Sequence, residues 1–395
     1  MSSALQSAPF GPSFRTHVMN AINIETLRGL ARQRLPRAIF EFVDGGAQDE
    51  LTLRANRDDF AALRLIPRVL TDIAKRDLSV ELLGQRYDAP LIMAPTGLAG
   101  LLSRNGELKA VRAAHRANIP YCLSTMATRS IEEIAQQGEA PNWFQLYVLR
   151  DRGLTKAFIE RARVARCSAL VLTVDTKLQG PRERDIRNGF TVPPRFTFST
   201  LVDFALHWRW LCDVWLGPKV KFRNFEGTGV NSDDSVTIAQ FISNQYDLSV
   251  GWRDVEWFKS QWGGPVLIKG LLHPADAARA VEAGLDGIIV SNHGGRQLDG
   301  AISSIAALPA VAEAVAGRVP VILDGGVRRG VDVIKAIALG ATACMIGRPW
   351  LYGLAAGGEN GVDTALNILQ KETDMALALL GCASLSEVNR GVLVD

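Results

Sequence analysis

The sequence predicts one α/β domain, a single (β/α)8 TIM barrel with N-terminal helices and a long insertion after the fourth strand. Eight short apolar runs, helix-like stretches between them and a spacing that is even except at one place predict this fold. Apolar runs without polar alternation are typical of strands in a parallel sheet that is buried on both faces. A doubly wound sheet is the competing arrangement, but it would not need eight units of such even spacing.

The predicted strands are short and occupy residues 90–94, 119–123, 143–146, 169–173, 266–268, 287–290, 319–323 and 343–346. Helical periodicity lies between them over 107–118, 153–166, 274–284 and 331–339. The even spacing breaks between Thr173 and Lys269, which predicts a lid insertion at about residues 178–250, above the carboxyl ends of the strands. We expect one domain over 1–395, with a barrel at 88–360 and a helical segment at 20–60 that Pro36 divides.

The composition is that of a globular protein, with 395 residues of which 47% are hydrophobic and 22% charged. A net charge of +3 gives no indication of nucleic acid binding. The five cysteines have no metal-ligand or redox spacing and are typical of reduced thiols in an intracellular protein, so we expect no metal site. We find no secretory signal and no run of about 18 apolar residues that could cross a membrane.

Polar and charged residues follow nearly every predicted strand. In a barrel of this kind, the strand ends and the loops behind them carry the working groups. The residues at these ends are Thr96, Ser124, Gln145, Tyr147, Thr173, Asp175, Lys269, His293, Arg296, Asp324, Arg328, Gly347 and Arg348. One polar strand end would only reflect contact with water, but a set so rich in arginine, lysine and histidine indicates an active site.

The run SNHGGRQLDG at residues 291–300 carries the clearest chemistry. Gly294 and Gly295 let the backbone approach a flat ligand closely. His293 could act as a base near neutral pH, and Arg296 could hold a carboxylate through two hydrogen bonds. We therefore interpret this run as a base beside a carboxylate clamp.

Two glycine-containing loops, at 324–330 and 347–349, follow the last two predicted strands. Loops in this position form the usual phosphate site of such barrels, and Arg328 and Arg348 would add positive charge to it. Lys269 ends the fifth strand, where a buried ammonium group needs a negative partner. A reduced flavin anion, a phosphate or a Schiff-base carbonyl could meet it, unless the side chain turns outward to solvent.

These segments together resemble the FMN-dependent 2-hydroxy acid oxidases and dehydrogenases, from about residue 22 to the C-terminus and least over 190–249. The resemblance is carried by APTG at 94–97, LSTMAT at 123–128, WFQLYVLRDRG at 143–153, LTVDT at 172–176, SNHGGRQLDG at 291–300, DGGVRRG at 324–330 and GRP at 347–349. It implies FMN as the cofactor. It also implies oxidation of small L-2-hydroxy acids, of the lactate or mandelate type, to 2-keto acids.

The resemblance further implies which residues hold FMN. Pro95, Thr96 and Gly97 would line the isoalloxazine near N5, and Lys269 would stabilise negative charge near N1 and C2=O. The other residues assigned to the cofactor would bond the ring or hold the ribityl chain and phosphate; they are Ser124, Gln145, Thr173, Ser291, Asp324, Gly326, Arg328, Gly347 and Arg348.

The catalytic roles follow from the same resemblance. His293 would be the base, and Asp175 would stabilise its imidazolium. Arg296 and Tyr147 would bind the substrate carboxylate and the developing charge, and Arg182 would face the substrate as a second arginine. Two mechanisms stay open: the α-proton leaves first, or hydride moves as the hydroxyl loses its proton.

Two positions, Phe42 and Gly97, narrow the predicted class of enzyme. Phe42, in the predicted substrate site, stands where the family usually has a tyrosine that donates a hydrogen bond to the substrate carboxylate. Loss of such a bond costs about 1.5–3 kcal/mol, which favours a bulkier or more apolar substrate or a weak KM. Gly97 is commonly alanine in the oxidases and glycine in the dehydrogenases, so it favours a dehydrogenase.

The insertion contains an apolar stripe with helical spacing over 201–215, followed by a basic run at 219–223. Trp208, Trp210 and Trp215 lie in this stripe. Such a helix either packs onto the barrel or anchors residues 195–225 at a membrane surface. An anchor predicts a peripheral protein on the cytoplasmic face of the inner membrane, with a membrane quinone as electron acceptor.

Several alternatives remain at this point. A soluble oxidase that uses O2 and releases H2O2 is the alternative to a quinone-linked dehydrogenase. An FMN barrel with a non-oxidative activity, such as an isomerase, is disfavoured by the base and clamp at His293 and Arg296. A non-catalytic binding protein is disfavoured more strongly than the isomerase. The family resemblance suggests a homotetramer.

Overall fold

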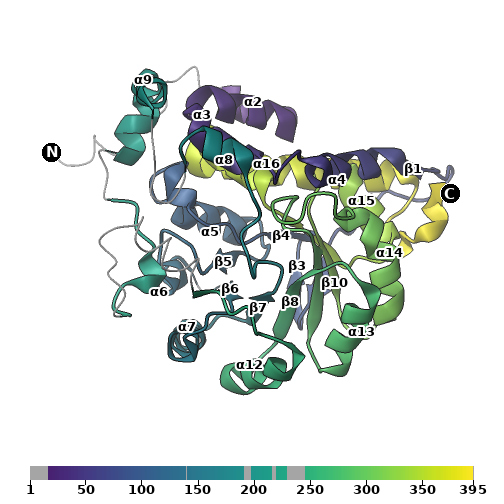
Figure 1. Cartoon of the computed structure of the whole chain (residues 1–395). Helices are drawn as coiled ribbons and strands as arrows, with labels where there is room; N and C mark the ends of the chain where they lie inside the picture. The colour runs from purple at the N-terminus through teal and green to yellow at the C-terminus, as the bar shows by residue number, and fades with distance from the viewer. Residues whose placement is uncertain (1–16, 139, 191–196, 216–218, 229–244, 395) are drawn as a thin grey trace.

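The computed structural model describes residues 17–138, 140–190, 197–215, 219–228 and 245–394. Its centre is an eight-stranded parallel sheet in the order β4-β11-β10-β9-β8-β7-β6-β5. The strands are β4 (Leu91–Met93), β5 (Cys122–Ser124), β6 (Trp143–Tyr147), β7 (Ala169–Thr173), β8 (Val266–Leu271), β9 (Gly287–Ser291), β10 (Val321–Asp324) and β11 (Ala343–Ile346). A parallel bridge between Met93 and Tyr121 joins the two ends of this order, so the sheet closes into a barrel (Figure 1). The predicted fold is confirmed.

A helix follows each barrel strand and packs on its outer side. These helices are α5 (Gly106–Arg116), α6 (Ile131–Ala135), α7 (Arg152–Val164), α12 (Val255–Trp262), α13 (Pro274–Glu282), α14 (Ser304–Val315), α15 (Gly330–Ala338) and α16 (Arg348–Leu380). Capping side chains decide where several of them begin: Asp151 accepts the N–H of Leu154 at the start of α7, at 2.9 Å. Helix α16 is kinked at Gly358, whose φ of 61° and ψ of −138° are not helical.

Tightly packed side chains fill the barrel interior. Ile92, Trp143 and Leu267 point into it and are at most 1% exposed. Leu82 and Tyr87 join the same cluster from a hairpin of two short strands, β2 (Val80–Leu82) and β3 (Gln85–Tyr87), which precedes β4. The sequence does not predict this hairpin, because strands of three residues are too short to show a periodicity.

The helices α2 (Ile24–Arg34), α3 (Arg37–Asp44) and α4 (Leu51–Ala62) precede the barrel. The first two confirm the helices predicted on either side of Pro36. Helix α2 packs along α16, and α3 contacts α8 (Glu183–Arg187) of the insertion (Figure 1). This packing brings α3 and α4 over the carboxyl ends of the barrel strands.

The insertion lies between β7 and β8, as predicted. Besides α8 it contains α9 (Phe198–Leu206), α10 (Trp208–Trp210), the π-helical turn η2 (Leu211–Trp215) and the 3-10 turns η3 (Arg223–Phe225) and η4 (Trp252–Asp254). In Figure 1, α9 projects from the body beside α2 and α3. No helix within the described ranges is both long and apolar enough to span a bilayer.

The prediction of one continuous helix over 201–215 is wrong. The backbone leaves the helical conformation at His207, where φ is −91° and ψ is 45°. The break lets Trp210 turn inward, where it is 2% exposed and donates from Nε1 to the carbonyl of Leu101 at 2.7 Å. Trp208 stays 59% exposed, and the side chain of Trp215 lies outside the described residues. The free energy gained by burying the Trp210 side chain exceeds the free energy lost by interrupting the helix at His207.

Candidate active site

The predicted site residues gather at the carboxyl ends of the barrel strands, under α3, α4 and α8 (Figure 1). The parallel registers place Thr173 beside Lys269 and Ser291 beside Asp324. Strand ends that are distant in sequence therefore meet at one mouth, as the barrel predicts.

His293 and Asp175 face each other across this mouth. Nδ1 of His293 lies 3.1 Å from Oδ1 of Asp175. The backbone of His293 is left-handed, with a φ of 58°. Burial lowers the pKa of His293, although Asp175 opposes this shift. Burial alone would raise the pKa of Asp175, but His293 outweighs it and the pKa is lowered. An ionised carboxylate thus orients a neutral imidazole, whose Nε2 could take a proton.

The loop that carries His293 is held by α4. Asn56 and Asn292 exchange two hydrogen bonds through their side-chain amides, at 2.9 and 2.8 Å. Gly295 has a φ of 74°, and a Cβ there would lie 2.6 Å from the backbone nitrogen of Leu53. Close contact with α4 therefore requires glycine at 295. The sequence analysis predicted a different reason, the approach of a flat ligand to the backbone. The sequence motifs do not reveal Asn56, because its partner is distant in the chain.

Tyr147, at the end of β6, packs edge to face against Tyr246 of the insertion, with ring centroids 5.4 Å apart. Burial, helped by the charge of Asp175, raises the pKa of Tyr147 to about 12. The phenol therefore stays protonated at neutral pH and could donate a hydrogen bond. Tyr246 was not predicted, because no recognisable motif surrounds it.

Two partly buried arginines, Arg182 and Arg296, reach the mouth without a carboxylate partner among the described residues. Nη1 of Arg296 donates to the carbonyls of Phe42 and Gly45, at 2.7 and 3.1 Å. Arg182 immediately precedes α8, and its buried Nε makes no hydrogen bond within the described part of the chain. Burial, followed by repulsion from Arg182, lowers the pKa of Arg296 well below its usual value, and Asp185 only partly offsets this. An incoming carboxylate would relieve this unfavourable charge.

Phe42 lies in α3 beside Arg296. The Arg296 guanidinium lies 5.2 Å from the centroid of the Phe42 ring, and the Phe190 ring lies 5.0 Å from it on the insertion side. The ring therefore gives the mouth an apolar wall and no hydrogen-bond donor.

Arg328, in the loop behind β10, and Arg348, at the start of α16, add two further partly buried cations. Arg348 donates to the carbonyls of Val43, Gly45 and Gly294, at 2.8–3.0 Å. Burial lowers the pKa of Arg328. Guanidinium groups at the starts of α15 and α16 could hold a phosphate dianion.

The loops at the mouth differ in how strictly their backbones require glycine. Gly326 has a φ of 83°, and a Cβ there would lie 2.1 Å from the carbonyl oxygen of Asn56. A Cβ on Gly347 would make only ordinary contacts, with Ala94 at 3.8 Å and Thr96 at 3.9 Å. A Cβ on Gly97, which follows Pro95 in the loop behind β4, would lie 2.9 Å from Cβ of Met126. The backbone therefore requires glycine at 326, while an alanine at 97 would displace the neighbouring loop slightly.

Lys269 does not turn outward to solvent. It is 3% exposed, and its Nζ lies 2.7 Å from Oδ2 of Asp324 and 2.9 Å from Oγ of Ser291. Burial would lower the pKa of Lys269, but Asp324 outweighs it and the pKa is raised. A lysine held in its charged form is suited to stabilising an anion and unsuited to forming a Schiff base.

Besides Asp175 and Arg182, three residues at the mouth have a buried polar atom without a hydrogen-bond partner within the described chain: Thr96 at Oγ1, Gln145 at Nε2 and Thr173 at Oγ1. Ser124 Oγ donates to Oε1 of Gln145 at 3.2 Å and so orients the amide. An unsatisfied buried polar group costs about 1–3 kcal/mol. A flat ring with donors and acceptors along its edge, such as isoalloxazine, would satisfy all three. With Lys269 and the two loop arginines, the residues present fit FMN.

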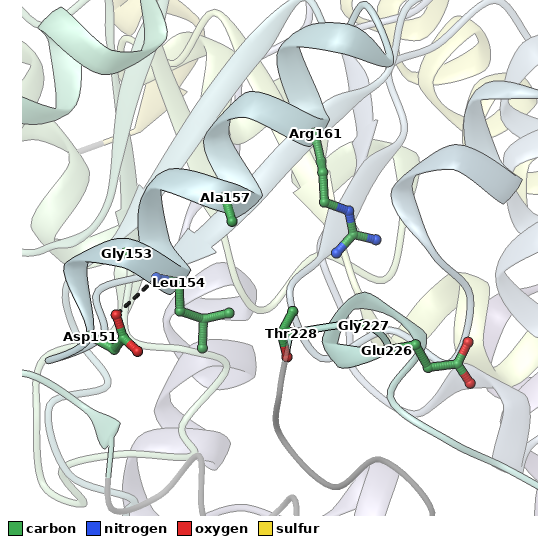
Figure 2. A pocket seen from close by; sticks show the side chains of 8 residues that line it. All are labelled: Asp151, Gly153, Leu154, Ala157, Arg161, Glu226, Gly227 and Thr228. Carbon is green, nitrogen blue, oxygen red and sulfur yellow. Dashed lines mark hydrogen bonds between the residues drawn. The ribbon is translucent and has the colours of Figure 1, made fainter.

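A separate cavity of about 420 Å³ lies between α7 and the turn after η3 (Figure 2). It is lined by Asp151, Gly153, Leu154, Ala157, Arg161, Glu226, Gly227 and Thr228. Asp151 caps α7, as the dashed line shows, and Arg161 pairs with Glu132 at 2.8 Å. These charged groups already have partners, so this cavity offers nothing like the chemistry of the barrel mouth.

A (β/α)8 barrel with a histidine–carboxylate pair, clustered arginines and unsatisfied ring-binding groups at its mouth defines a flavin-dependent oxidoreductase. Comparison with known proteins supports this class and narrows it. The FMN-dependent dehydrogenase family model matches residues 31–395. The chain belongs to this family.

Individual relatives agree with that assignment. The chain is 43% identical over 371 residues to an L-lactate dehydrogenase of Alcaligenes faecalis, covering 93% of this chain and 97% of the relative. It is 44% identical over 368 residues to an L-lactate dehydrogenase of Xanthobacter autotrophicus, covering 93% and 95%. The crystal structure of the monotopic membrane protein (S)-mandelate dehydrogenase superposes with a TM-score of 0.92 at 40% identity, covering 95% of this chain and 100% of that chain.

These findings confirm the predicted barrel, the FMN cofactor and the FMN-dependent oxidation of L-2-hydroxy acids. The predicted roles of the individual residues stay predictions.

Proposed function

We propose that this chain oxidises small L-2-hydroxy acids with an apolar side chain, of the lactate or mandelate type, to 2-keto acids and delivers the electrons to a membrane quinone. One arrangement carries the proposal. Nδ1 of His293 lies 3.1 Å from Asp175, beside two partly buried arginines, Arg182 and Arg296, that have no carboxylate partner among the described residues. A base next to two such guanidinium groups suits an acid whose hydroxyl carbon lies one bond from the carboxylate.

Arg296 and Arg182 hold the substrate carboxylate, and Tyr147 donates a hydrogen bond from its protonated phenol. The apolar ring of Phe42 packs against the substrate and supplies no hydrogen bond to the carboxylate. Binding therefore depends more on the two guanidinium groups and on apolar contact. This is the basis for proposing a substrate with an apolar side chain.

His293 takes one proton from the bound substrate at Nε2. Asp175 stabilises the imidazolium that results, because its carboxylate accepts the hydrogen bond from Nδ1. FMN, when bound, would supply the acceptor for the two electrons and the second proton that the substrate loses. Neutral His293 is the reactive form, and its lowered pKa keeps that form populated at neutral pH.

The chain's own groups also account for cofactor binding. Thr96, Gln145 and Thr173 would satisfy their unpaired atoms on the ring, and Lys269 would place its charge beside it. The remaining assigned residues, Pro95, Gly97, Ser124, Ser291, Asp324, Gly326, Arg328, Gly347 and Arg348, would line the ring or hold the ribityl chain and phosphate. Arg328 and Arg348 would supply the charge for the phosphate.

Peripheral membrane association is the second part of the proposal. Phe198 and Leu206 on α9 are 83% and 74% exposed, and Trp208 on α10 is 59% exposed; both helices are too short to cross a bilayer. Arg209 stacks on Trp208 at 5.4 Å, which is a pairing suited to a membrane interface. Residues 195–225, of which 195–196 and 216–218 are not described, would rest on the cytoplasmic face of the inner membrane, where a quinone is available.

Two further features belong to this proposal. One domain over 1–395 would comprise the N-terminal helical segment 20–60, a barrel at 88–360 and a lid at about 178–250. The chain would assemble as a homotetramer, which light scattering of the FMN-loaded protein would test.

Anaerobic mixing of the FMN-loaded protein with L-lactate, (S)-mandelate and glycolate tests the activity. We expect the flavin absorbance to bleach with the first two and more slowly with glycolate, and we expect no bleaching with D-lactate. His293→Gln should keep its flavin spectrum and fail to bleach. Absence of bleaching with every L-acid would overturn the proposed substrate class, and steady H2O2 release in air would favour an oxidase.

A further inference from the structure

A small basic pocket opens beside the insertion, outside the barrel mouth. Its positive side chains come from separate segments: Arg104 precedes α5, Arg129 precedes α6, and Lys219 and Arg223 belong to the insertion. Val214 and Val220 form part of its wall. Its enclosed part leaves about 20 Å³ for the centres of water-sized groups, which is room for one small group.

The charges around this pocket are not balanced. Arg129 pairs with Glu133 at 2.8 Å, and Arg223 pairs with Glu226 at 3.1 Å. Arg104 and Lys219 are exposed, and neither forms an ion pair within the described ranges.

The buried acid near the pocket, Glu107, is engaged by Thr128 and Arg129 rather than by Arg104 or Lys219. Glu107 accepts two hydrogen bonds from Thr128, at 2.6 and 2.8 Å, and burial raises its pKa. The pocket therefore has about two unpaired positive charges, together with the N-terminus of α5, which also favours an anion.

The pocket is joined to the exposed apolar surface by one short stretch of chain. Val214 in its wall follows Trp208 by six residues, and the stretch between them is fixed to the body. Asp213 pairs with Arg34 at 3.0 Å, and Trp210 donates to the carbonyl of Leu101. In Figure 1, α9 and α6 lie on the same side of the molecule, so one surface could meet the apolar helix and the pocket together.

We propose that this pocket binds the phosphate of an anionic phospholipid headgroup, with Arg104 and Lys219 as its principal ligands. The inference rests on the proposed membrane association and specifies what the chain recognises there. A lipid phosphate that enters next to the inserted apolar helix neutralises both unpaired cations, and arginine can bind it through two hydrogen bonds. A zwitterionic headgroup would bring a choline cation toward the same charges, so it binds less well.

Titration of the FMN-loaded protein with short-chain phosphatidylglycerol, below its micelle concentration, tests the pocket without a membrane. We expect saturable binding of one lipid per chain and no comparable binding of short-chain phosphatidylcholine. The double variant Arg104→Gln/Lys219→Gln should weaken phosphatidylglycerol binding by about tenfold or more, because it removes both cations that bind the phosphate. Arg209→Gln is the matched control, since it removes an exposed arginine from the same side but outside the pocket.

Each outcome decides the proposal. Unchanged phosphatidylglycerol affinity in the double variant, or an equal loss in Arg209→Gln, would overturn the pocket as the binding site. Displacement of the lipid by equimolar inorganic phosphate would overturn the lipid as its occupant. Failure of the native protein to float with any vesicle would overturn membrane association, whereas equal flotation with neutral and anionic vesicles would overturn the pocket alone.

Discussion

The barrel mouth and the insertion differ in how their chemical groups are satisfied. At the mouth, Lys269 pairs with Asp324 in the interior, and His293 is held by Asp175. In the insertion, Leu206 is 74% exposed on α9, although Asp203 of the same helix accepts the backbone N–H of Arg37 at 2.7 Å and Asp213 further along pairs with Arg34. The base and the cofactor-binding groups therefore lie on the barrel, whereas the insertion adds Arg182 to the mouth and leaves apolar surface on α9 for another partner.

The largest effect is expected at the base. His293→Gln should lower kcat by about 10²–10⁴-fold, because no other group at the mouth is positioned to take the proton. Anaerobic stopped-flow reduction of the flavin measures it. His273→Gln, at the exposed start of α13, is the control and should react at the native rate. A comparable loss in both variants would show that the effect is not specific to the mouth.

Arg296→Lys should lower kcat/KM by about 10–100-fold, because lysine cannot keep its bonds to Phe42 and Gly45 while holding a carboxylate with two donors. Steady-state kinetics with L-lactate and a soluble acceptor would show it. Arg318→Lys is matched, since Arg318 also binds two backbone carbonyls, at the end of α14. If Arg296→Lys showed native kinetics, Arg296 would not be part of the substrate clamp.

Phe42→Tyr should raise kcat/KM for L-lactate by about three- to tenfold, since the new hydroxyl can donate to the substrate carboxylate and a hydrogen bond contributes about 0.5–1.5 kcal/mol. The gain should be smaller for (S)-mandelate if apolar contact already governs its binding. Phe190→Tyr, the ring 5.0 Å away, is the control. A loss of activity with both acids would contradict the assigned position of Phe42 beside the carboxylate.

The pH dependence follows from the lowered pKa of His293. The neutral imidazole is the base, so activity is lost as the pH falls through this pKa. The acid limb of kcat/KM should therefore lie below pH 6.5, the ordinary value of the group. In Asp175→Asn the limb should move to lower pH, because Asp175 raises the pKa, and kcat should also fall. An acid limb above pH 6.5 in the native enzyme would contradict this assignment.

The smallest effect on catalysis is expected in the insertion. Leu206→Glu should change kcat with a soluble acceptor by less than about twofold, because exposed substitutions rarely alter the folded core. The same variant should release the protein from membranes in flotation assays. Leu379→Glu, at a site 70% exposed on α16, is the matched control and should still float. If Leu206→Glu and Leu379→Glu float equally well with membranes, α9 is not the anchor.

Much of the fold and of the mouth could be predicted because both depend on local patterns. Buried parallel strands appear as apolar runs, and residues at their ends must meet at one mouth, which brings His293 and Asp175 together from distant segments. Tyr246 and Asn56 could not be found in this way, since their positions depend on contacts across the chain that no motif records. The helix break at His207 was missed because the apolar stripe continues through it.

The sequence by itself determined the barrel, the strand-end residues and the flavin-dependent chemistry, because periodicity and motifs encode local structure directly. Only the tertiary structure decided which charges are paired. It assigned Asp324 to Lys269, left Arg296 and Arg182 without a carboxylate partner among the described residues, and separated an inward Trp210 from an exposed Trp208. Pairing and burial depend on distances between segments, and one-dimensional spacing does not contain those distances.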